Sequence, residues 1–317
     1  MCILDAATTD TGGLSWKGLE AFGSLTVHPR TAPDEIAARA AGKQVVITNK
    51  AVLTREILKE LPDLKLVCLL STGTNAVDLE ACRERGIPVC NIPAYSTDSV
   101  AEHTFALILA QARRVEAHDR AVHEGGWVES PDFCFTVHPQ CELAGRTLGL
   151  VGFGEIAQAV ARIASAFRMR VLATTRTEEG KPDLGQEFVQ LDDLLDASDI
   201  VSLHCPLTPE TEKLINGNTL NRMKEGAWLV NTGRGGLLDE AAVARSLEEG
   251  HLGAALLDVL SSEPPDPGNP LLSAPRCVIT PHVAWATRAA RERLIELLVG
   301  NVRCFLEGES RNVVNGV

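Results

Sequence analysis

Three short segments in the last third of the chain contain side chains that could bind an anion and transfer a proton. They are residues 231–236, 258–265 and 280–285. Arg234 in the first segment is a planar, forked donor suited to a carboxylate. His282 can give up a proton near neutral pH, and Glu263 could orient its ring and stabilise the imidazolium form. Taken singly, the arginine could form a structural salt bridge and the histidine a loop hydrogen bond, but the three together favour a catalytic site.

A glycine-rich turn in the middle of the chain could bind a dinucleotide. Residues 148–157 are Leu-Gly-Leu-Val-Gly-Phe-Gly-Glu-Ile-Ala, which fits the pattern GxGxxA. Gly152 would permit the tight turn and Gly154 the close approach of a pyrophosphate, while Ala157 would keep the helix near the strand. The backbone amides of Glu155 and Ile156 would point at the phosphates from the helix N-terminus. The alternative is a tight strand–helix turn without a ligand, and the flanking strands and helix argue against it.

The second strand after this turn bears on the type of cofactor. Residues 171–177 contain no acid that could hold the ribose hydroxyls of NAD. Thr175 and Arg176 offer a hydroxyl and a guanidinium instead, which suit the 2′-phosphate of NADP. The alternative is a solvated arginine in an NAD enzyme that uses other ribose contacts. The sequence thus favours NADP over NAD.

The elements that must position these segments alternate between short apolar runs and helical patterns. Several runs are continuously apolar, as in a parallel sheet covered on both faces, so the sequence predicts an α/β fold with parallel sheets. The expected strands are residues 45–48, 66–70, 87–91, 148–152, 170–174, 200–203, 228–231, 255–258 and 277–280.

A long helical pattern marks the expected domain boundary. It follows several N-cap candidates at residues 96–99 and runs from Val100 to about Arg120, with an apolar surface on all sides at residues 105–110. Such a helix could join two domains or lie in a dimer interface, so we expect a homodimer that also uses the loop at residues 125–140. The final helix, from Thr287 to Leu306, would return to the first domain. The predicted domains are residues 1–97 with 287–317, and residues 98–286.

With these segments the sequence resembles the D-isomer-specific 2-hydroxyacid dehydrogenase family along essentially its full length. The similarity is strongest to the glycerate dehydrogenase/hydroxypyruvate reductase branch, through residues 93–100, 130–135 and 282–285. The resemblance implies two doubly wound parallel-sheet domains, a Rossmann coenzyme domain inserted in a flavodoxin-like substrate domain. It also implies NAD(P)H-dependent reduction of a small 2-oxoacid, hydroxypyruvate and also glyoxylate, to the D-2-hydroxyacid, and the reverse oxidation.

The resemblance assigns further roles to individual residues. Arg234 would hold the carboxylate and the ketone of the oxoacid, His282 would protonate the ketone oxygen, and Trp285 would narrow the pocket. Asp258 would accept a hydrogen bond from the nicotinamide carboxamide, although it could equally be a turn aspartate. The other residues implied to bind cofactor or substrate are Thr72, Gly73, Thr74, Thr232 and Gly233.

The sequence leaves two assignments open. The loop at residues 71–75 could be an anion-binding nest or an ordinary turn. Lys50, at a strand end, could reach the cleft, but a solvated lysine is favoured. The chain departs from the family at Ala157, which replaces the commoner third glycine, and at Thr175, where many members have the ribose-binding aspartate.

Two other functions compete with this interpretation. A non-catalytic, dinucleotide-sensing protein could have the same fold, although the presence of Arg234, Glu263 and His282 argues against it. A dehydrogenase of the same superfamily could instead act on phosphite or formate. Formate oxidation releases no hydroxyl proton, so a Glu–His pair argues against that substrate.

The composition indicates which binding partners and which cellular compartment to expect. The 317 residues have a net charge of −12, which opposes general binding of nucleic acids or anionic membranes. The nine cysteines show no CxxC pair or zinc-like spacing, the N-terminus shows no signal peptide, and no apolar run approaches a membrane span. We therefore expect a cytoplasmic protein with reduced cysteines, no structural metal and a small anionic substrate.

Overall fold

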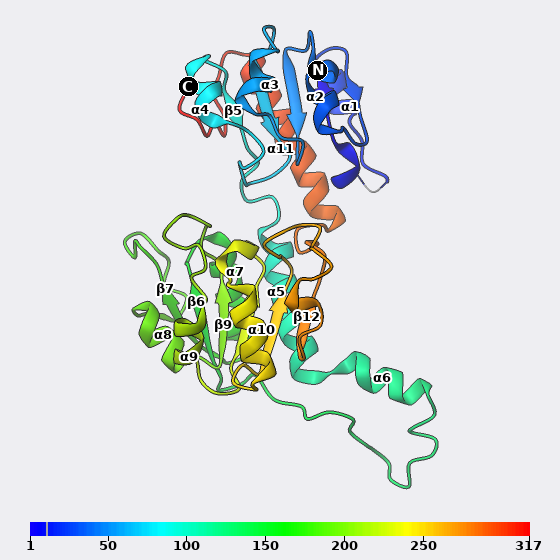
Figure 1. Ribbon diagram of the computed structural model, residues 1–317, viewed down its shortest axis with the longest axis vertical. Helices are drawn as coiled ribbons and strands as arrows, with labels where there is room; N and C mark the ends of the chain where they lie inside the picture. The colour runs from blue at the N-terminus through cyan, green and yellow to red at the C-terminus, as the bar shows by residue number, and fades with distance from the viewer. Residues whose placement is uncertain (11) are drawn as a thin grey trace. The chain divides into compact units, whose positions relative to one another are not determined.

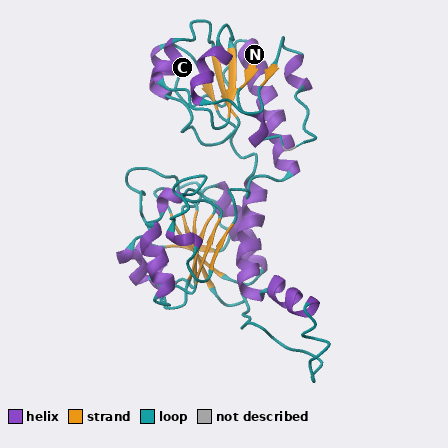
Figure 2. Cartoon of the chain, turned by 45° about the vertical axis from the view of Figure 1, so that its right-hand side comes forward, coloured by secondary structure: helices purple, strands orange, loops and turns teal. Residues whose placement is uncertain are grey.

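The computed structural model describes residues 1–10 and 12–317 of the chain (Figure 1). The chain divides into two compact units, Met1–Ser96 with Ala286–Val317, and Thr97–Trp285. The chain passes from one unit to the other one residue earlier, at both crossings, than the predicted boundaries. In each unit, helices and loops surround a central sheet (Figure 2).

The first unit contains a five-stranded parallel sheet with the strand order β2-β1-β3-β4-β5. This is the order of flavodoxin-like folds. Its middle strands are buried along their whole length, which explains their continuously apolar sequences. The strands are β1 Cys2–Ile3, β2 Thr26–Val27, β3 Val45–Thr48, β4 Leu66–Leu69 and β5 Val89–Cys90. The helices are α1 Lys17–Glu20, α2 Ile36–Ala40, α3 Arg55–Lys59, α4 Leu79–Glu84 and α11 Arg288–Leu306.

The second unit contains a seven-stranded parallel sheet with the order β12-β11-β10-β9-β6-β7-β8. Counted from β6, this is the Rossmann order with one additional strand. The strands are β6 Thr147–Val151, β7 Arg170–Thr174, β8 Gln186–Phe188, β9 Ile200–Leu203, β10 Trp228–Asn231, β11 Ala254–Leu257 and β12 Cys277–Ile279. The helices are α5 Thr97–Arg113, α6 Val115–His123, α7 Glu155–Ala166, α8 Leu191–Ala197, α9 Gly217–Arg222 and α10 Glu240–Glu248. The predicted fold class is therefore confirmed.

The long helix expected from Val100 to about Arg120 is two helices, so this prediction was wrong. Arg114 has a φ of 50°, a left-handed conformation that a right-handed helix cannot include, and it separates α5 from α6. α5 packs against α7 within the same unit, and Phe105 stacks on Phe167 with ring centroids 5.5 Å apart. The apolar surface of α5 is thus largely covered inside the unit. α6 has no buried residue, and it leads into a loop that extends away from the sheet (Figure 1).

The nine cysteines are all free thiols, several of them in the core. Burial raises the pKa of Cys277 to about 12 and the pKa values of Cys2 and Cys82 to about 11. These thiols stay protonated at neutral pH and pack as small apolar groups. Over residues 1–10 and 12–317, the structure has no helix with the length and apolarity needed to cross a membrane.

Candidate active site

The turn after β6 leaves no room for any residue but glycine at position 152. Gly152 has a φ of 93°, and a Cβ there would lie 2.7 Å from the backbone nitrogen of Cys205 and the carbonyl oxygen of His204. The Gly152 amide donates to the carbonyl of Thr174 at the end of β7, over 2.9 Å. The turn is therefore fixed between β7 and the loop after β9.

The start of α7 is open where a phosphate would approach. Gly154 is the N-cap, and a Cβ at this position would meet nothing within 4 Å. Glu155 is exposed and Ile156 half-buried at the first turn, whereas Ala157 is fully buried against the core. A helix N-terminus with unobstructed amides is a ready anion site, so these residues fit the diphosphate of a dinucleotide.

Thr175 and Arg176 follow β7 at the edge of this turn. The Thr175 hydroxyl lies 3.4 Å from the carbonyl oxygen of Thr177, and Arg176 is exposed. The pKa of Glu210 is lowered chiefly by a hydrogen bond from Thr208 and, less strongly, by the charge of Arg176. Arg176 therefore lies near the loop that follows β9, a neighbour that the sequence did not suggest.

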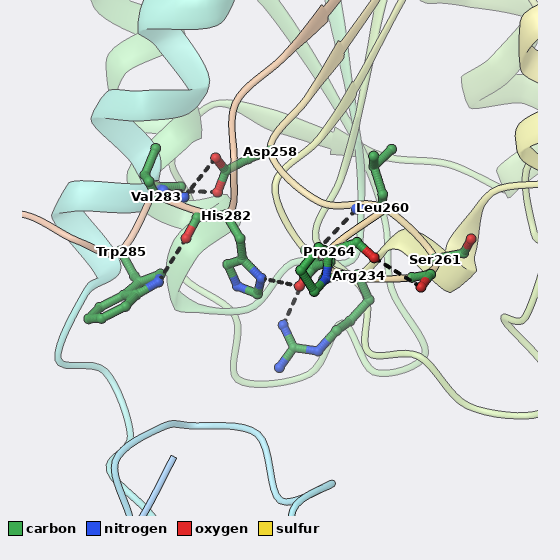
Figure 3. A network of polar contacts seen from close by, with 12 residues as sticks. Arg234, Asp258, Leu260, Ser261, Pro264, His282, Val283 and Trp285 are labelled. Atoms are coloured by element: carbon green, nitrogen blue, oxygen red, sulfur yellow. Dashed lines mark hydrogen bonds and ion pairs between the residues drawn. The ribbon is translucent and has the colours of Figure 1, made fainter. Parts of the chain in front are cut away.

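The predicted proton donor and its carboxylate are in direct contact (Figure 3). Nδ1 of His282 lies 2.6 Å from Oε2 of Glu263, and Oε1 of Glu263 accepts a bond from the Leu260 amide over 3.2 Å. The His282 side chain is 29% exposed and that of Glu263 34% exposed, so a small ligand can reach the pair. Because Nδ1 faces Glu263, Nε2 is the nitrogen available to a substrate.

The backbone of His282 is held in an unusual conformation. Its φ is 54°, which costs a non-glycine residue about 1–3 kcal/mol and persists only where neighbours enforce it. The His282 amide donates to the carbonyls of Asp258 and Thr280, and its own carbonyl accepts from the Trp285 indole over 3.0 Å. Trp285, expected as a pocket wall, therefore also fixes the histidine.

Asp258, directly after β11, holds the loop that contains His282. Its carboxylate is 1% exposed and accepts bonds from the Thr280 hydroxyl and from the amides of Val283 and Ala284, over 2.5, 2.9 and 2.8 Å. Nε2 of His103 lies 3.5 Å from the same carboxylate. The structure thus gives Asp258 a positioning role within the chain, and its contact with a nicotinamide stays a prediction.

Arg234 follows β10 in a turn that Asn231 fixes. The Asn231 side chain donates to the Arg234 carbonyl over 2.8 Å and accepts from the Gly233 amide over 3.0 Å. The guanidinium of the half-buried Arg234 donates to the Gly233 carbonyl. In Figure 3 it lies below the His282 ring, on the same side of the site as that ring. The Thr232 hydroxyl, in contrast, is buried 3.2 Å from that of Thr104 on α5.

Within the first unit, the loop after β4 is held by hydrogen bonds within the loop and to the segment after β5. The exposed Thr72 donates through its hydroxyl to the Ile92 carbonyl over 2.8 Å, and Ser71 donates to the Gly73 carbonyl over 2.7 Å. Thr74 is half-buried in the same turn. The side chain of Lys50 is exposed, in line with the favoured solvated lysine.

Residues 105–284 match the sequence model described as "D-isomer specific 2-hydroxyacid dehydrogenase, NAD binding domain". A hydroxypyruvate reductase of Blautia hydrogenotrophica is 42% identical over 99% of this chain and 98% of its own length. The chain belongs to the D-isomer-specific 2-hydroxyacid dehydrogenase family. A glycerate dehydrogenase of Methylorubrum extorquens is 41% identical over 89% of this chain and 88% of its own length. A solved acyclic imino acid reductase in complex with NADPH and D-Arg has a TM-score of 0.87 at 30% identity, over 99% of this chain and all of that one.

In this D-2-hydroxyacid dehydrogenase, several residues around the site were not predicted from the sequence. His103 contacts the Thr280 hydroxyl over 2.9 Å from a position 177 residues away, and no local pattern indicates such a pair. His204, after β9, contacts the Ser202 hydroxyl over 2.9 Å, and burial lowers its pKa to about 4. The position of His204 directly after a buried strand was the only available signal.

Proposed function

We propose that this protein reduces hydroxypyruvate, and also glyoxylate, with NADPH and catalyses the reverse oxidation of the D-2-hydroxyacid. The observation that carries the proposal is the contact between Glu263 and His282, on the same side of the site as Arg234. These residues follow β10, β11 and β12, three neighbouring strands of one parallel sheet. Ligands of doubly wound folds bind at the carboxyl edge where such strands end. The names of the relatives support the choice of substrate.

Residues of this chain would bind the substrate and would supply the proton for its reduction. Arg234 would hold the carboxylate and the ketone oxygen through its forked guanidinium. A bound reduced nicotinamide supplies the hydride, so negative charge develops on the ketone oxygen. His282 would donate the proton from Nε2, and Glu263, on Nδ1, would stabilise the imidazolium form before transfer. In oxidation the neutral ring would accept the hydroxyl proton.

The cofactor proposed is NADP, held by the second unit. The amides of Glu155 and Ile156 beside the open Gly154 would bind the diphosphate, and Thr175 and Arg176 would bind the 2′-phosphate. The family name mentions NAD and one solved relative holds NADPH, so the preference rests on the residues of this chain.

The remaining contacts follow the family resemblance. Thr232, Gly233 and Asp258 would line the nicotinamide side of the site, and Trp285 would limit the size of the substrate. The loop with Thr72, Gly73 and Thr74 would bind the substrate carboxylate through its amides, with Thr72 near the cofactor. In this proposal residues 98–286 form the coenzyme domain, and residues 1–97 with 287–317 form the substrate domain.

The biological unit proposed is a homodimer. α6 and the loop after it expose large apolar side chains with no cover from their own unit, which is typical of an interaction surface. Phe133 is 89% exposed and Val128 90% exposed. A second copy of the chain is the proposed partner for this segment.

An assay panel tests the activity. The purified protein is mixed with NADPH or NADH and with hydroxypyruvate, glyoxylate, pyruvate or phenylpyruvate, and cofactor oxidation is followed by absorbance. We expect the highest kcat/KM with hydroxypyruvate and NADPH, and a large loss of kcat in His282→Ala with cofactor affinity retained. Cofactor binding without turnover of any oxoacid would instead indicate a dinucleotide-sensing protein.

A further inference from the structure

The loop that contains Glu263 has few anchors of its own. Residues 261–268 are all exposed, and the nearest core residues are Leu260 before the loop and Leu271 after it. A loop without buried apolar side chains takes its conformation from hydrogen bonds. The contact between Glu263 and His282 therefore needs a polar restraint on this loop.

A single carboxylate on α10 joins the beginning of this loop to its end. Oε1 of Glu240 accepts from the Ser261 amide over 2.7 Å, and Oε2 accepts from the Ser261 hydroxyl over 2.7 Å. Oε2 also accepts from the side-chain amide of Asn269 over 2.8 Å. Glu240 is the first residue of α10, whose N-terminus is capped by Asp239, so the carboxylate stands on a fixed element. Short hydrogen bonds to a charged acceptor are stronger than hydrogen bonds between neutral groups.

Ser261, which forms two of these bonds, is the neighbour in sequence of a residue that contacts Glu263. Ser261 adjoins Leu260, whose amide donates to Oε1 of Glu263 over 3.2 Å. Ser261 itself lies on the opposite side of Pro264 from His282 (Figure 3). Each of these three bonds ends on Ser261 or Asn269, residues other than Arg234, Glu263 and His282, which would meet a substrate.

We propose that Glu240 is a positioning residue for the Glu263–His282 pair. Its carboxylate binds both ends of the loop of residues 261–269, and it thereby keeps the Glu263 carboxylate in contact with Nδ1 of His282. The inference rests on the proposed function in taking this pair as the proton donor. The effect of Glu240 on the contact between Glu263 and His282 can be measured without any substrate.

The experiment compares Glu240→Ala with Glu248→Ala, a matched control on the same helix whose side chain is exposed. The imidazole signal of His282 is followed by NMR against pH in the full-length protein, and its absence from the His282→Ala spectrum identifies it. Loss of the contact with the charged Glu263 should favour the neutral ring, so we expect a lower titration midpoint in Glu240→Ala. The shift should be smaller than that of Glu263→Gln. Glu248→Ala should titrate like the wild type.

Kinetics add a second measurement. We expect kcat for reduction to fall between about twofold and tenfold in Glu240→Ala, with the KM for NADPH unchanged. If Glu240 acts through Glu263, the double variant Glu240→Ala/Glu263→Gln should have the same midpoint as Glu263→Gln alone. Additive shifts, or an unchanged midpoint in a folded Glu240→Ala, would overturn the proposal.

Two precautions keep the outcome interpretable. Should Glu240→Ala fail to fold, Glu240→Gln keeps one oxygen for the Ser261 amide and places an NH₂ group against the donor of Asn269. It should therefore shift the midpoint in the same direction by less, and no shift in this folded variant would also overturn the proposal. If the protein reduces none of the oxoacids yet the midpoint shifts, the proposed function fails while the role of Glu240 stands.

Discussion

His282 is fixed at both its ring and its backbone, and this decides which nitrogen can exchange a proton. Nδ1 is held by the Glu263 carboxylate, and the backbone bonds to Asp258, Thr280 and Trp285 hold the residue at a positive φ. In the proposed mechanism, reduction requires the imidazolium form of His282 and oxidation requires the neutral ring. The two directions should therefore depend on pH in opposite ways.

Glu263→Gln tests this assignment. Gln keeps a hydrogen-bonding group but removes the charge that would favour the imidazolium ring, so reduction should lose activity at a lower pH. Oxidation should persist further into acid by the same reasoning. The measurement is kcat/KM against pH for hydroxypyruvate and D-glycerate. Coinciding profiles for the variant and the wild type would remove Glu263 from the mechanism.

Arg176 should control the choice between the two nicotinamide cofactors. Arg176→Ala removes a charge-assisted hydrogen bond to the 2′-phosphate, so the KM for NADPH should rise roughly ten- to a hundredfold while that for NADH changes little. Arg162→Ala, at an exposed position on α7, is the control. Equal effects of Arg176→Ala on both cofactors would contradict NADP specificity.

His204 should make the protein less stable in acid. Burial lowers its pKa to about 4, against about 6.5 in the unfolded chain, so the unfolded state binds more protons between these two pH values. Stability therefore falls as the pH drops through this window, by at most about 2 kcal/mol at pH 5. His204→Gln should lack this part of the loss in urea unfolding at pH 7.5 and pH 5. The exposed His138→Gln should behave like the wild type, and an equal acid loss in His204→Gln would contradict the assignment.

At the scale of elements, the sequence predicted best where strands are buried on both faces. β3, β6 and β9 were found because each is a mostly apolar run, and every one of their residues is buried. β1, β2 and β8 were not predicted because no longer apolar run surrounds them: β1 has only two residues, β2 is exposed, and β8 is mostly polar. The break at Arg114 escaped because nothing in its residue type requires a positive φ.

The turn after β10 contains an element-scale restraint at Gly235. A Cβ there would lie 1.9 Å from the carbonyl carbon of Leu260, so the Arg234 turn and the Glu263 loop touch backbone to backbone. Gly235→Ala should force these loops apart, lowering kcat together with stability by about 1–3 kcal/mol. Gly217→Ala, where a Cβ would meet nothing within 4 Å, should leave both unchanged. Thermal unfolding and kcat/KM for hydroxypyruvate measure the outcome, and a fully active Gly235→Ala would contradict this restraint.

At the scale of the molecule, topology explains why the three proposed catalytic residues could be placed at one edge of the sheet from the sequence and the residues around them could not. Arg234, Glu263 and His282 follow neighbouring parallel strands, so the fold alone brings their segments to one edge of the sheet. The contacts of Glu240 with Ser261 and of His103 with Thr280 depend on loop conformations and on helix placement. No spacing in the sequence encodes such contacts.

The proposed assembly gives a prediction for the whole molecule. The sequence predicts a homodimer from an apolar helix and from the loop at residues 125–140; α7 packs against that helix, so the proposal rests on the exposed segment from α6 onward. There the Trp127 indole donates to the Phe133 carbonyl and His118 accepts from the Val137 amide, so the exposed side chains are presented by a folded segment. Sedimentation at micromolar concentration should give about twice 34.0 kDa. Val128→Glu/Phe133→Glu should shift the mass toward the monomer, because a charge cannot be buried unpaired in an apolar interface. Val52→Glu, at an exposed position in the first unit, should stay dimeric, and a wild-type mass of 34.0 kDa would contradict the homodimer.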